Sequence, residues 1–502
     1  MQWASWALLV AVLAGLQVVH DRVHSALGPE GYMDEMFHLR QAQAYCRGEY
    51  AVWDGKITTY PGLYLLSSGL HGLARLAPGL GLVGPECSAG ELRQGNALLV
   101  ALTYVACVLA RRKSSSAGAA AAAAAAAGGG AQECSESAAS AHLYALLIVL
   151  YPLSAFYYPL YYTDTASTCT LVLMYLVSSF GARQVVGQSQ ISSFVLASAA
   201  IAVRQTNAVW VLFVVGANML RELQQQQLLP LIEDQPYLSQ LAAFVWALLR
   251  HPLQLARSNA GLISAVLWFV VLVLRNGGVV VVGDKENHRP ALHAAMPLHL
   301  AAVTTATLGP SALLAGWEAV AAALPSRGDA ASNSKPGWSS RLPTASAIAI
   351  HSLCTAAVSA ALVLGSVEHP FLLADNRHYT FYLWRRLLRF PLWRAMLGPP
   401  YYLCLLFVAR TMREAGRGKL WLTIYVVAAV LSLVPTPLLE PRYWTPGVVI
   451  ILLNAPSARS TAQLGALAVS VALCLAINAA ATHVFLERTF VGPDGQLARF
   501  MY

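Results

Sequence analysis

The chain has 502 residues, of which 57% are hydrophobic and only 11% are charged, and its mean hydropathy is +0.53. Soluble domains carry about 25% charged residues, so this composition excludes an ordinary soluble protein and predicts a membrane protein whose apolar surplus faces lipid. The formal net charge of +9 does not indicate a nucleic-acid partner, because the basic residues cluster in short loops beside apolar runs, where they act as orientation signals.

The first apolar run, residues 3–19, is expected to stay in the protein as a span, because Leu16–His20 is a poor cleavage site for a signal peptide. The short apolar stretches 191–203 and 208–220 flank Arg204–Asn207 and are interpreted as two tilted or broken spans. A crossing needs about 20 residues. The remaining expected spans are 94–110, 140–158, 166–182, 262–282, 291–315, 345–365, 395–412, 419–434, 444–456 and 461–483.

Residues 60–76 are either a further span or a helix that lies in the membrane interface. If they do not cross and the N-terminus is cytosolic, the basic clusters all fall on the cytosolic side, whereas a crossing would move the later clusters to the opposite side. Basic residues favour cytosolic loops, so we predict an interfacial helix. The clusters are Arg111–Lys113, Arg183, Arg221, Arg250 with Arg257, Arg327–Arg341, Arg410–Lys419 and Arg459.

Two low-complexity segments fall on the cytosolic side of this map. Residues 114–140 contain the run Ala119–Ala127 followed by three glycines, and residues 326–343 are rich in small and polar residues. Both are expected to be flexible cytosolic loops. No segment has the composition of a soluble domain, so residues 1–502 are expected to form a single multi-span membrane domain.

The opposite face receives loops that mix acids, bases, aromatics and amides, and this asymmetry predicts that the chemistry lies there. Cys46 and Cys87 both fall in its first region and can form a disulfide, whereas no CxxC pair indicates a zinc site. No P-loop, GxGxxG or HExxH motif occurs, which argues against a nucleotide-driven pump. The polar segments run from Asp34 to residue 60 and over Tyr161–Asp164, Arg204–Asn207, Gly283–His288, His369–Arg386 and Pro435–Tyr443.

Asp34 and Glu35 follow the first span directly. A carboxylate in a membrane-facing cleft can act as a general base, because its pKa can be raised there. The alternative is a solvated pair at a helix start, where acids are common. Trp53 and Asp54 suit a sugar, since the ring covers C–H faces and the carboxylate accepts hydroxyl hydrogens. The alternative for Trp53 is an interfacial anchor before a turn.

The densest polar segment contains Asp375, Arg377 and His378. Arg377 and His378 can hold a phosphate, and Asp375 can orient either of them. The alternative is an amphipathic interfacial helix with an aromatic belt.

Two further arginines are also candidates. Arg204 lies between apolar stretches, where an unpaired charge is costly, so we expect a functional role or a buried ion pair with Asp164 as its candidate partner. Arg442 lies at the start of a span and can reach a phosphate, or it can snorkel as an anchor.

Taken together, these segments resemble the dolichyl-phosphate-glucose-dependent α-1,2-glucosyltransferases of the endoplasmic reticulum. The resemblance runs through nearly the whole chain, and the Asp375–Tyr382 string is its most specific part. The matching stretches are Tyr32–His38, Gln41–Gln43, Tyr45-Cys46, Trp53-Asp54, Ile57–Thr59, Pro61–Tyr64, Tyr161–Thr163, Arg204–Asn207, Asn276–Gly278, Gly283-Asp284, Ala374–Tyr382, Leu439-Glu440, Arg442-Tyr443 and Arg499–Met501.

The resemblance implies an all-α polytopic GT-C type glycosyltransferase with lumenal loops, in the endoplasmic reticulum membrane. It implies dolichyl phosphate glucose as donor and a diglucosylated oligosaccharide on dolichyl diphosphate as acceptor, and an inverting displacement without metal or cofactor. Asp34 is the expected base, with Glu35 as its alternative or partner. The expected substrate-binding residues are Trp53, Asp54, Asp164, Arg204, Gln205, Asp375, Arg377, His378, Tyr379 and Arg442.

Two alternatives to this function stay open. A related enzyme with dolichyl phosphate mannose as donor would share the same architecture. A membrane transporter or scaffold is the non-enzymatic alternative, but a transporter typically shows internal repeats and polar residues at the membrane midplane. This sequence has no internal repeat, and its polar residues gather at one face.

Overall fold

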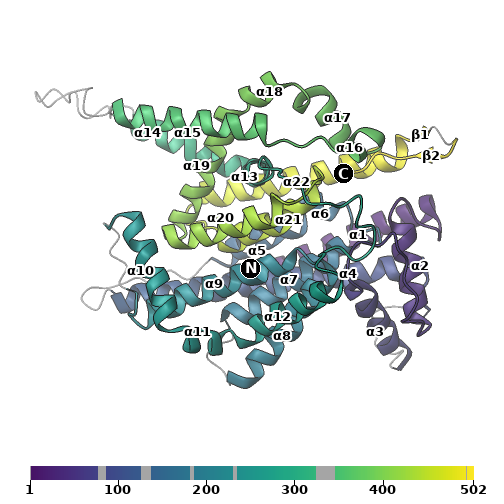
Figure 1. The fold of residues 1–502 in the computed structure, drawn as a ribbon. Helices are drawn as coiled ribbons and strands as arrows, with labels where there is room; N and C mark the ends of the chain where they lie inside the picture. Colours follow the sequence, from purple (N-terminus) through teal and green to yellow (C-terminus); the bar gives the residue numbers. More distant parts are fainter. Residues whose placement is uncertain are drawn as a thin grey trace, which may run out of the picture.

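The computed structural model describes residues 2–76, 86–125, 137–180, 186–229, 235–323, 345–492 and 495–502, and these residues are mostly helical (Figure 1). The first helices are α1 (Gln2–Leu27), α2 (Glu35–Cys46), α3 (Gly62–Leu76), α4 (Ala89–Ala125), α5 (Ala138–Val149), α6 (Pro152–Ala155), α7 (Thr163–Phe180), α8 (Val186–Val203), α9 (Asn207–Gln225), α10 (Tyr237–Arg250), α11 (Pro252–Ser258) and α12 (Ala260–Arg275).

The later helices are α13 (Met296–Thr307), α14 (Gly309–Ala323), α15 (Ala345–Leu364), α16 (Pro370–Ala374), α17 (Tyr379–Leu383), the π-helical turn η4 (Trp384–Leu388), α18 (Pro391–Met396), α19 (Gly398–Glu414), α20 (Lys419–Leu433), the 3-10 turn η5 (Pro441–Trp444), α21 (Thr445–Asn454) and α22 (Thr461–Glu487). Strands β1 (Phe490–Val491) and β2 (Leu497–Ala498) form a short antiparallel hairpin after α22.

Four described helical stretches are long and apolar enough to cross a membrane. They are Ala89–Ser114 in α4, α15, Pro391–Glu414 over α18 and α19, and α22. Two bent pairs raise the number to six: α11 with α12, bent by 89°, and α13 with Gly309–Glu318 in α14, bent by 82°. These findings confirm an all-α membrane protein.

Two expected spans are interrupted at proline. The expected span 140–158 ends its first helix at Val149, and the expected span 291–315 bends between α13 and α14. Pro152 and Pro310 explain both breaks, because proline lacks an amide hydrogen and clashes with the preceding turn. The predicted break between 191–203 and 208–220 is confirmed, because α8 ends at Val203 and α9 begins at Asn207.

The prediction of a flexible loop over 114–140 is wrong for its first part, because α4 continues through the alanine run to Ala125. Alanine has the highest intrinsic helix propensity, so the run extends the preceding helix. Residues 126–136 and the predicted loop 326–343 lie outside the described residues, as does Arg183.

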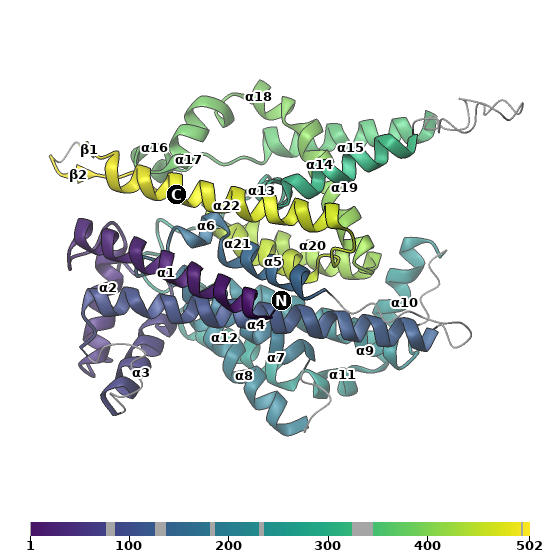
Figure 2. The same cartoon turned by 180° about the vertical axis from the view of Figure 1, so that it is seen from behind.

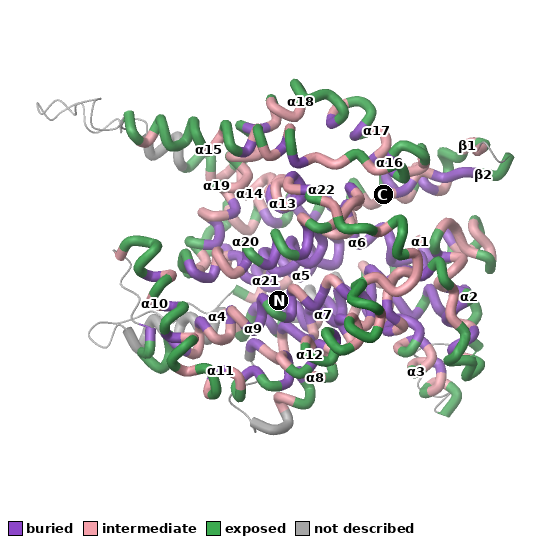
Figure 3. The backbone as a smooth tube through the Cα atoms, viewed as in Figure 1, coloured by how far each residue is buried: buried purple, intermediate pink, exposed green. Residues whose placement is uncertain are grey.

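Figure 3 shows where the core lies: buried residues gather in α5, α7 and α21, whereas α15 and α18 are largely exposed. Every residue of α21 is buried, as expected of a helix that is apolar on all sides and lies inside an assembly. In contrast, only 11% of the spanning window of α15 is buried. Its exposed apolar side chains therefore suit contact with lipid.

The two ends of the assembly carry different elements. Figures 1 and 2 show α2, α3, α16 and the β1–β2 hairpin at one end, and α10 toward the other. A disulfide between Cys46 and Cys87 joins the end of α2 to the segment before α4. Helix α3 is not among the stretches long enough to span, so its interfacial placement stays a prediction.

Candidate active site

Asp34 and Glu35 are neighbours in sequence but lie in opposite environments. Asp34 immediately precedes α2 and is exposed, and within the described part of the chain its carboxylate makes no hydrogen bond or ion pair. Glu35 is fully buried and forms a two-pronged ion pair with Arg93, with Oε1–Nε at 2.8 Å and Oε2–Nη2 at 2.9 Å. Its oxygens also accept the backbone amides of Tyr161 and Tyr32. This geometry favours Asp34 as the base and gives Glu35 the task of holding the loop.

A second polar group combines two arginines with two carboxylates. Asp164, at the start of α7, accepts Arg204 Nη1 at 3.1 Å, which confirms the expected ion pair, and Arg442 Nη1 at 3.4 Å. Arg442 also bonds Glu440 through Nε at 2.9 Å. The formal charge of the four side chains is balanced, so burial leaves no uncompensated ion.

The first two polar groups belong to one site. The guanidinium of Arg442 lies 4.8 Å from the ring centroid of Tyr157 and 5.5 Å from that of Tyr162. The charges of Asp34 and Arg442 both act on Tyr157, on Tyr162 and on His38. Asp34 and Arg442 therefore both lie near Tyr157, Tyr162 and His38.

His38 is a site residue that the sequence reasoning missed. It lies one helical turn after Asp34, its Nδ1 is 2.6 Å from the hydroxyl of Tyr64, and its ring meets Tyr162 edge-on at 5.7 Å. Burial lowers the pKa of His38 to about 4, although the nearby charge of Asp34 opposes the shift. The i, i+4 spacing from Asp34 was the available signal, since it puts both side chains on one face of α2.

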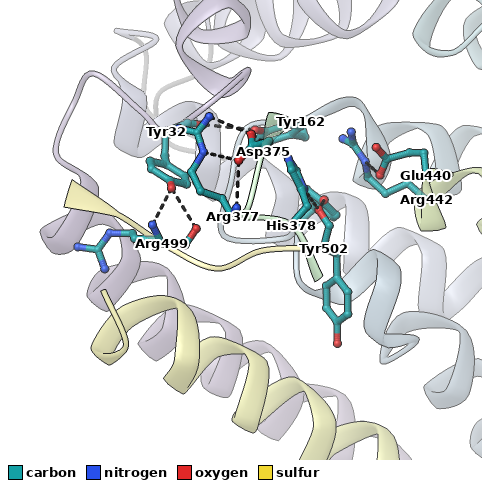
Figure 4. Close-up of polar contacts among 10 residues, drawn as sticks. Tyr32, Tyr162, Asp375, Arg377, His378, Glu440, Arg442, Arg499 and Tyr502 are labelled. Carbon is teal, nitrogen blue, oxygen red and sulfur yellow. Dashed lines mark hydrogen bonds and ion pairs between the residues drawn. The ribbon is translucent and has the colours of Figure 1, made fainter. Parts of the chain in front are cut away.

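The third polar group lies between α16 and α17 (Figure 4). Asp375 forms a two-pronged pair with Arg377, with Oδ1–Nε at 2.8 Å and Oδ2–Nη2 at 2.9 Å. Nε2 of His378 is 3.7 Å from the same carboxylate. Burial alone would raise the pKa of Asp375, but hydrogen bonds from Arg377 outweigh it and lower that pKa. Tyr379 is half-buried and begins α17, with its ring against Tyr502.

The loop before α3 carries Trp53 and Asp54, and it also contacts Gln205. The backbone amide of Asp54 donates to Gln41 in α2, and Trp53 packs edge-on against Tyr64. Gln205 donates to the carbonyl of Thr58 at 3.0 Å. The buried indole nitrogen of Trp53 and Oε1 of Gln205 have no hydrogen-bond partner among the described residues. A buried polar atom without a partner can bond a sugar hydroxyl.

No described group of three or more His, Cys, Asp and Glu side chains is arranged to hold a metal ion. The polar atoms of the site come instead from arginine, histidine, carboxylate, amide and phenol groups. The arrangement can therefore accept a proton at Asp34, bind an anion through Arg377 and His378, and hold hydroxyl groups near Trp53.

The chain is similar to curated proteins over nearly its whole length. A protein of Rattus norvegicus is 29% identical over 94% of this chain and 93% of its own. One of Arabidopsis thaliana is 28% identical over 89% and 90%, and one of Homo sapiens is 28% identical over 94% and 93%. All three are named Dol-P-Glc:Glc(2)Man(9)GlcNAc(2)-PP-Dol alpha-1,2-glucosyltransferase. No solved structure matches the chain.

A family model agrees with these similarities. The model of the DIE2/ALG10 family matches residues 28–453. The matched range includes Asp34, the Asp164 ion pairs, the Asp375–His378 segment and Arg442. Because the match covers most of the chain, this protein belongs to the DIE2/ALG10 family.

Proposed function

We propose that the chain transfers the third and last glucose from dolichyl phosphate glucose, in α-1,2 linkage, to the diglucosylated oligosaccharide on dolichyl diphosphate. The names of the relatives support this donor and acceptor. We also propose that the reaction takes place on the lumenal side of the endoplasmic reticulum membrane. The Cys46–Cys87 disulfide beside the site supports an oxidising compartment.

The proposed step is a single displacement that inverts the anomeric carbon. Asp34 takes the proton from the acceptor 2-hydroxyl while that oxygen bonds to the anomeric carbon of glucose. The bond from that carbon to the phosphate oxygen breaks, and dolichyl phosphate leaves with the bonding electrons. The observation that carries the assignment is the exposed Asp34 carboxylate, which no described side chain neutralises, whereas Glu35 is committed to Arg93.

The departing phosphate needs cations placed where its charge develops. Arg377 and His378 are the first candidates, because their side chains are 34% and 24% exposed. Arg204 and Arg442 are only 10% and 15% exposed, so their guanidinium groups are less accessible to a phosphate. We therefore assign the second pair to support of the site wall and the first pair to direct contact with phosphate.

Trp53, Asp54 and Gln205 are the proposed sugar-binding residues. Trp53 and Gln205 offer an indole N–H and an amide oxygen that have no partner in the described part of the chain, and both can bond hydroxyl groups. Asp54 already accepts the backbone amide of Lys56, so it would hold a hydroxyl through its second oxygen. A phosphate leaving group held by arginine and histidine needs no metal ion, and the reaction is proposed to run in the presence of EDTA.

The test offers purified protein in detergent each donor separately, dolichyl phosphate glucose or dolichyl phosphate mannose, with the diglucosylated lipid-linked acceptor and EDTA. Mass spectrometry then measures one added hexose. We expect transfer from the glucose donor, and a loss of about 100- to 10,000-fold in Asp34→Asn, because general-base catalysis contributes that much.

Glu30→Gln is the matched control, because Glu30 is an exposed acid in the same turn and should leave transfer unchanged. Near-normal transfer by Asp34→Asn would show that Asp34 is not the general base. If the folded wild-type protein adds no hexose from either donor, the proposed function is rejected. If it transfers a hexose from dolichyl phosphate mannose alone, the enzyme uses mannose and not glucose as the transferred sugar.

A further inference from the structure

The segment Arg499–Tyr502, here called the terminal strap, pairs with the loop that carries Arg377 and His378. The amide of Met501 donates to the carbonyl of Arg377 at 2.9 Å, and the amide of Tyr379 donates to the carbonyl of Met501 at 3.0 Å. His378 and Met501 thus form a parallel bridge. Met501 is only 2% exposed. The strap lies beyond residues 28–453, which match the family model.

The other end of the strap holds the turn before Asp34. The hydroxyl of Tyr32 accepts the amide of Arg499 at 2.7 Å and donates to the carbonyl of Arg499 at 3.0 Å (Figure 4). The Arg499 side chain, which is largely buried, donates to the carbonyls of Phe485 and Leu486 at the end of α22. The strap is therefore fixed to the scaffold on one side and to Tyr32 on the other.

Tyr502 fixes the orientation of His378. Its main-chain oxygen accepts Nδ1 of His378 at 2.8 Å and the hydroxyl of Tyr157 at 2.9 Å. A main-chain oxygen only accepts hydrogen bonds, so Nδ1 carries a hydrogen and Nε2 is turned toward Asp375. The ring of Tyr502 packs against Phe156 at 5.2 Å and against Tyr379 at 5.1 Å.

We propose that the terminal strap is a positioning segment that sets the spacing between Asp34 and the phosphate-binding pair Arg377 and His378. This inference rests on the proposed function. The strap bonds the backbone of the loop that carries Arg377 and His378, and it bonds the side-chain hydroxyl of Tyr32 in the turn before Asp34. Displacing a positioned group by about 1 Å can cost a hundredfold in rate, so loss of the strap lowers kcat through geometry.

The experiment compares full-length protein with a variant that ends at Phe500 and with Tyr32→Phe, using the same hexose-transfer assay. We expect kcat to fall by about 10- to 100-fold in each. KM for the donor should change little, because groups aligned for the transition state affect kcat more than ground-state binding. Glu414→Gln is the control, because it breaks the exposed Arg410–Glu414 pair within α19, and no strap residue takes part in that pair.

A double-mutant cycle separates positioning from a purely structural role. If the strap acts through His378, then truncation at Phe500 should cost little further activity in a His378→Asn background. Additive losses, or variants with wild-type kcat, would overturn the inference. A wild-type protein that transfers no hexose would instead reject the proposed function, so the two failures are distinguishable.

Discussion

At the residue scale, the buried pair of Glu35 and Arg93 is the most consequential interaction near the site. Both side chains are fully buried, and Glu35 joins α2 to α4 and to the loop before α7. Its neighbour Asp34 is exposed, so two adjacent carboxylates have separate tasks. Substituting each to its amide should therefore give opposite patterns of activity and stability.

We expect Glu35→Gln to lower the free energy of unfolding by about 3–5 kcal/mol, because it leaves the Arg93 charge buried without a counter-ion. Thermal unfolding in detergent measures the effect. Asp34→Asn should unfold like wild type although it is inactive. Glu49→Gln, in the exposed pair with Arg47, serves as a control with no measurable loss. A Glu35→Gln protein as stable as wild type would show that the pair does not hold the loop.

His38 should make stability depend on pH in one window. Burial lowers its pKa from 6.5 to about 4, so between these values the unfolded chain binds a proton that the folded protein excludes. The free energy of unfolding is therefore not reduced by this residue above about pH 6.5, and it decreases as the pH falls toward 4. We expect the melting temperature of His38→Gln to fall less steeply across this window. Parallel pH profiles for the two proteins would contradict the prediction.

At the element scale, the site is built where helices break. The loop after Pro152 supplies Tyr157 and Tyr162, the gap between α8 and α9 supplies Arg204, and the turn before α21 supplies Arg442. A broken helix leaves polar backbone and side-chain groups at its ends, and at membrane depth these are tolerated only where protein or a water-filled cavity surrounds them. The breaks therefore concentrate polar groups at one place.

The contact of α3 with α8 gives an element-scale prediction. A Cβ atom on Gly62 would lie 2.4 Å from the carbonyl carbon of Ala202, so Gly62→Ala must push the two helices apart. We expect a loss of about 1–3 kcal/mol, which is typical of overpacking, measured by thermal unfolding. Gly69→Ala in the same helix meets no described atom within 4 Å, and it should be neutral or slightly stabilising, because alanine favours helix. Equal stability of both variants would rule out the close approach.

At the scale of the whole molecule, the predicted orientation can be tested by glycosylation. The chain contains no Asn-X-Ser/Thr acceptor site, so it provides a clean background. An acceptor site with a short spacer, inserted beside Glu286, should receive a glycan in microsomes if that loop is lumenal, whereas one beside Gly416 should not. The measurement is an endoglycosidase-sensitive increase in mass. Glycosylation at Gly416 alone would invert the proposed orientation.

The sequence by itself determined the class of the protein and the identity of its polar loops. Low charge, apolar runs and basic clusters follow from the lipid solvent, which acts on each segment separately. The pairing of Arg204 with Asp164 could be anticipated for the same reason, because an arginine between apolar stretches needs a counter-charge. The family resemblance rests on short strings within these same loops.

Only the tertiary structure decided which polar residues are available for chemistry. Glu35 faces Arg93 from α4, Arg442 shares Asp164 with Arg204, and the terminal strap meets Arg377 and Tyr32. Glu35 and Arg93 are 58 positions apart in the chain, and Tyr32 and Arg499 are 467 apart, so no local pattern links them. Burial and hydrogen bonding set which carboxylate can accept a proton, and both depend on long-range packing, so the separate tasks of Asp34 and Glu35 emerge only in the folded protein.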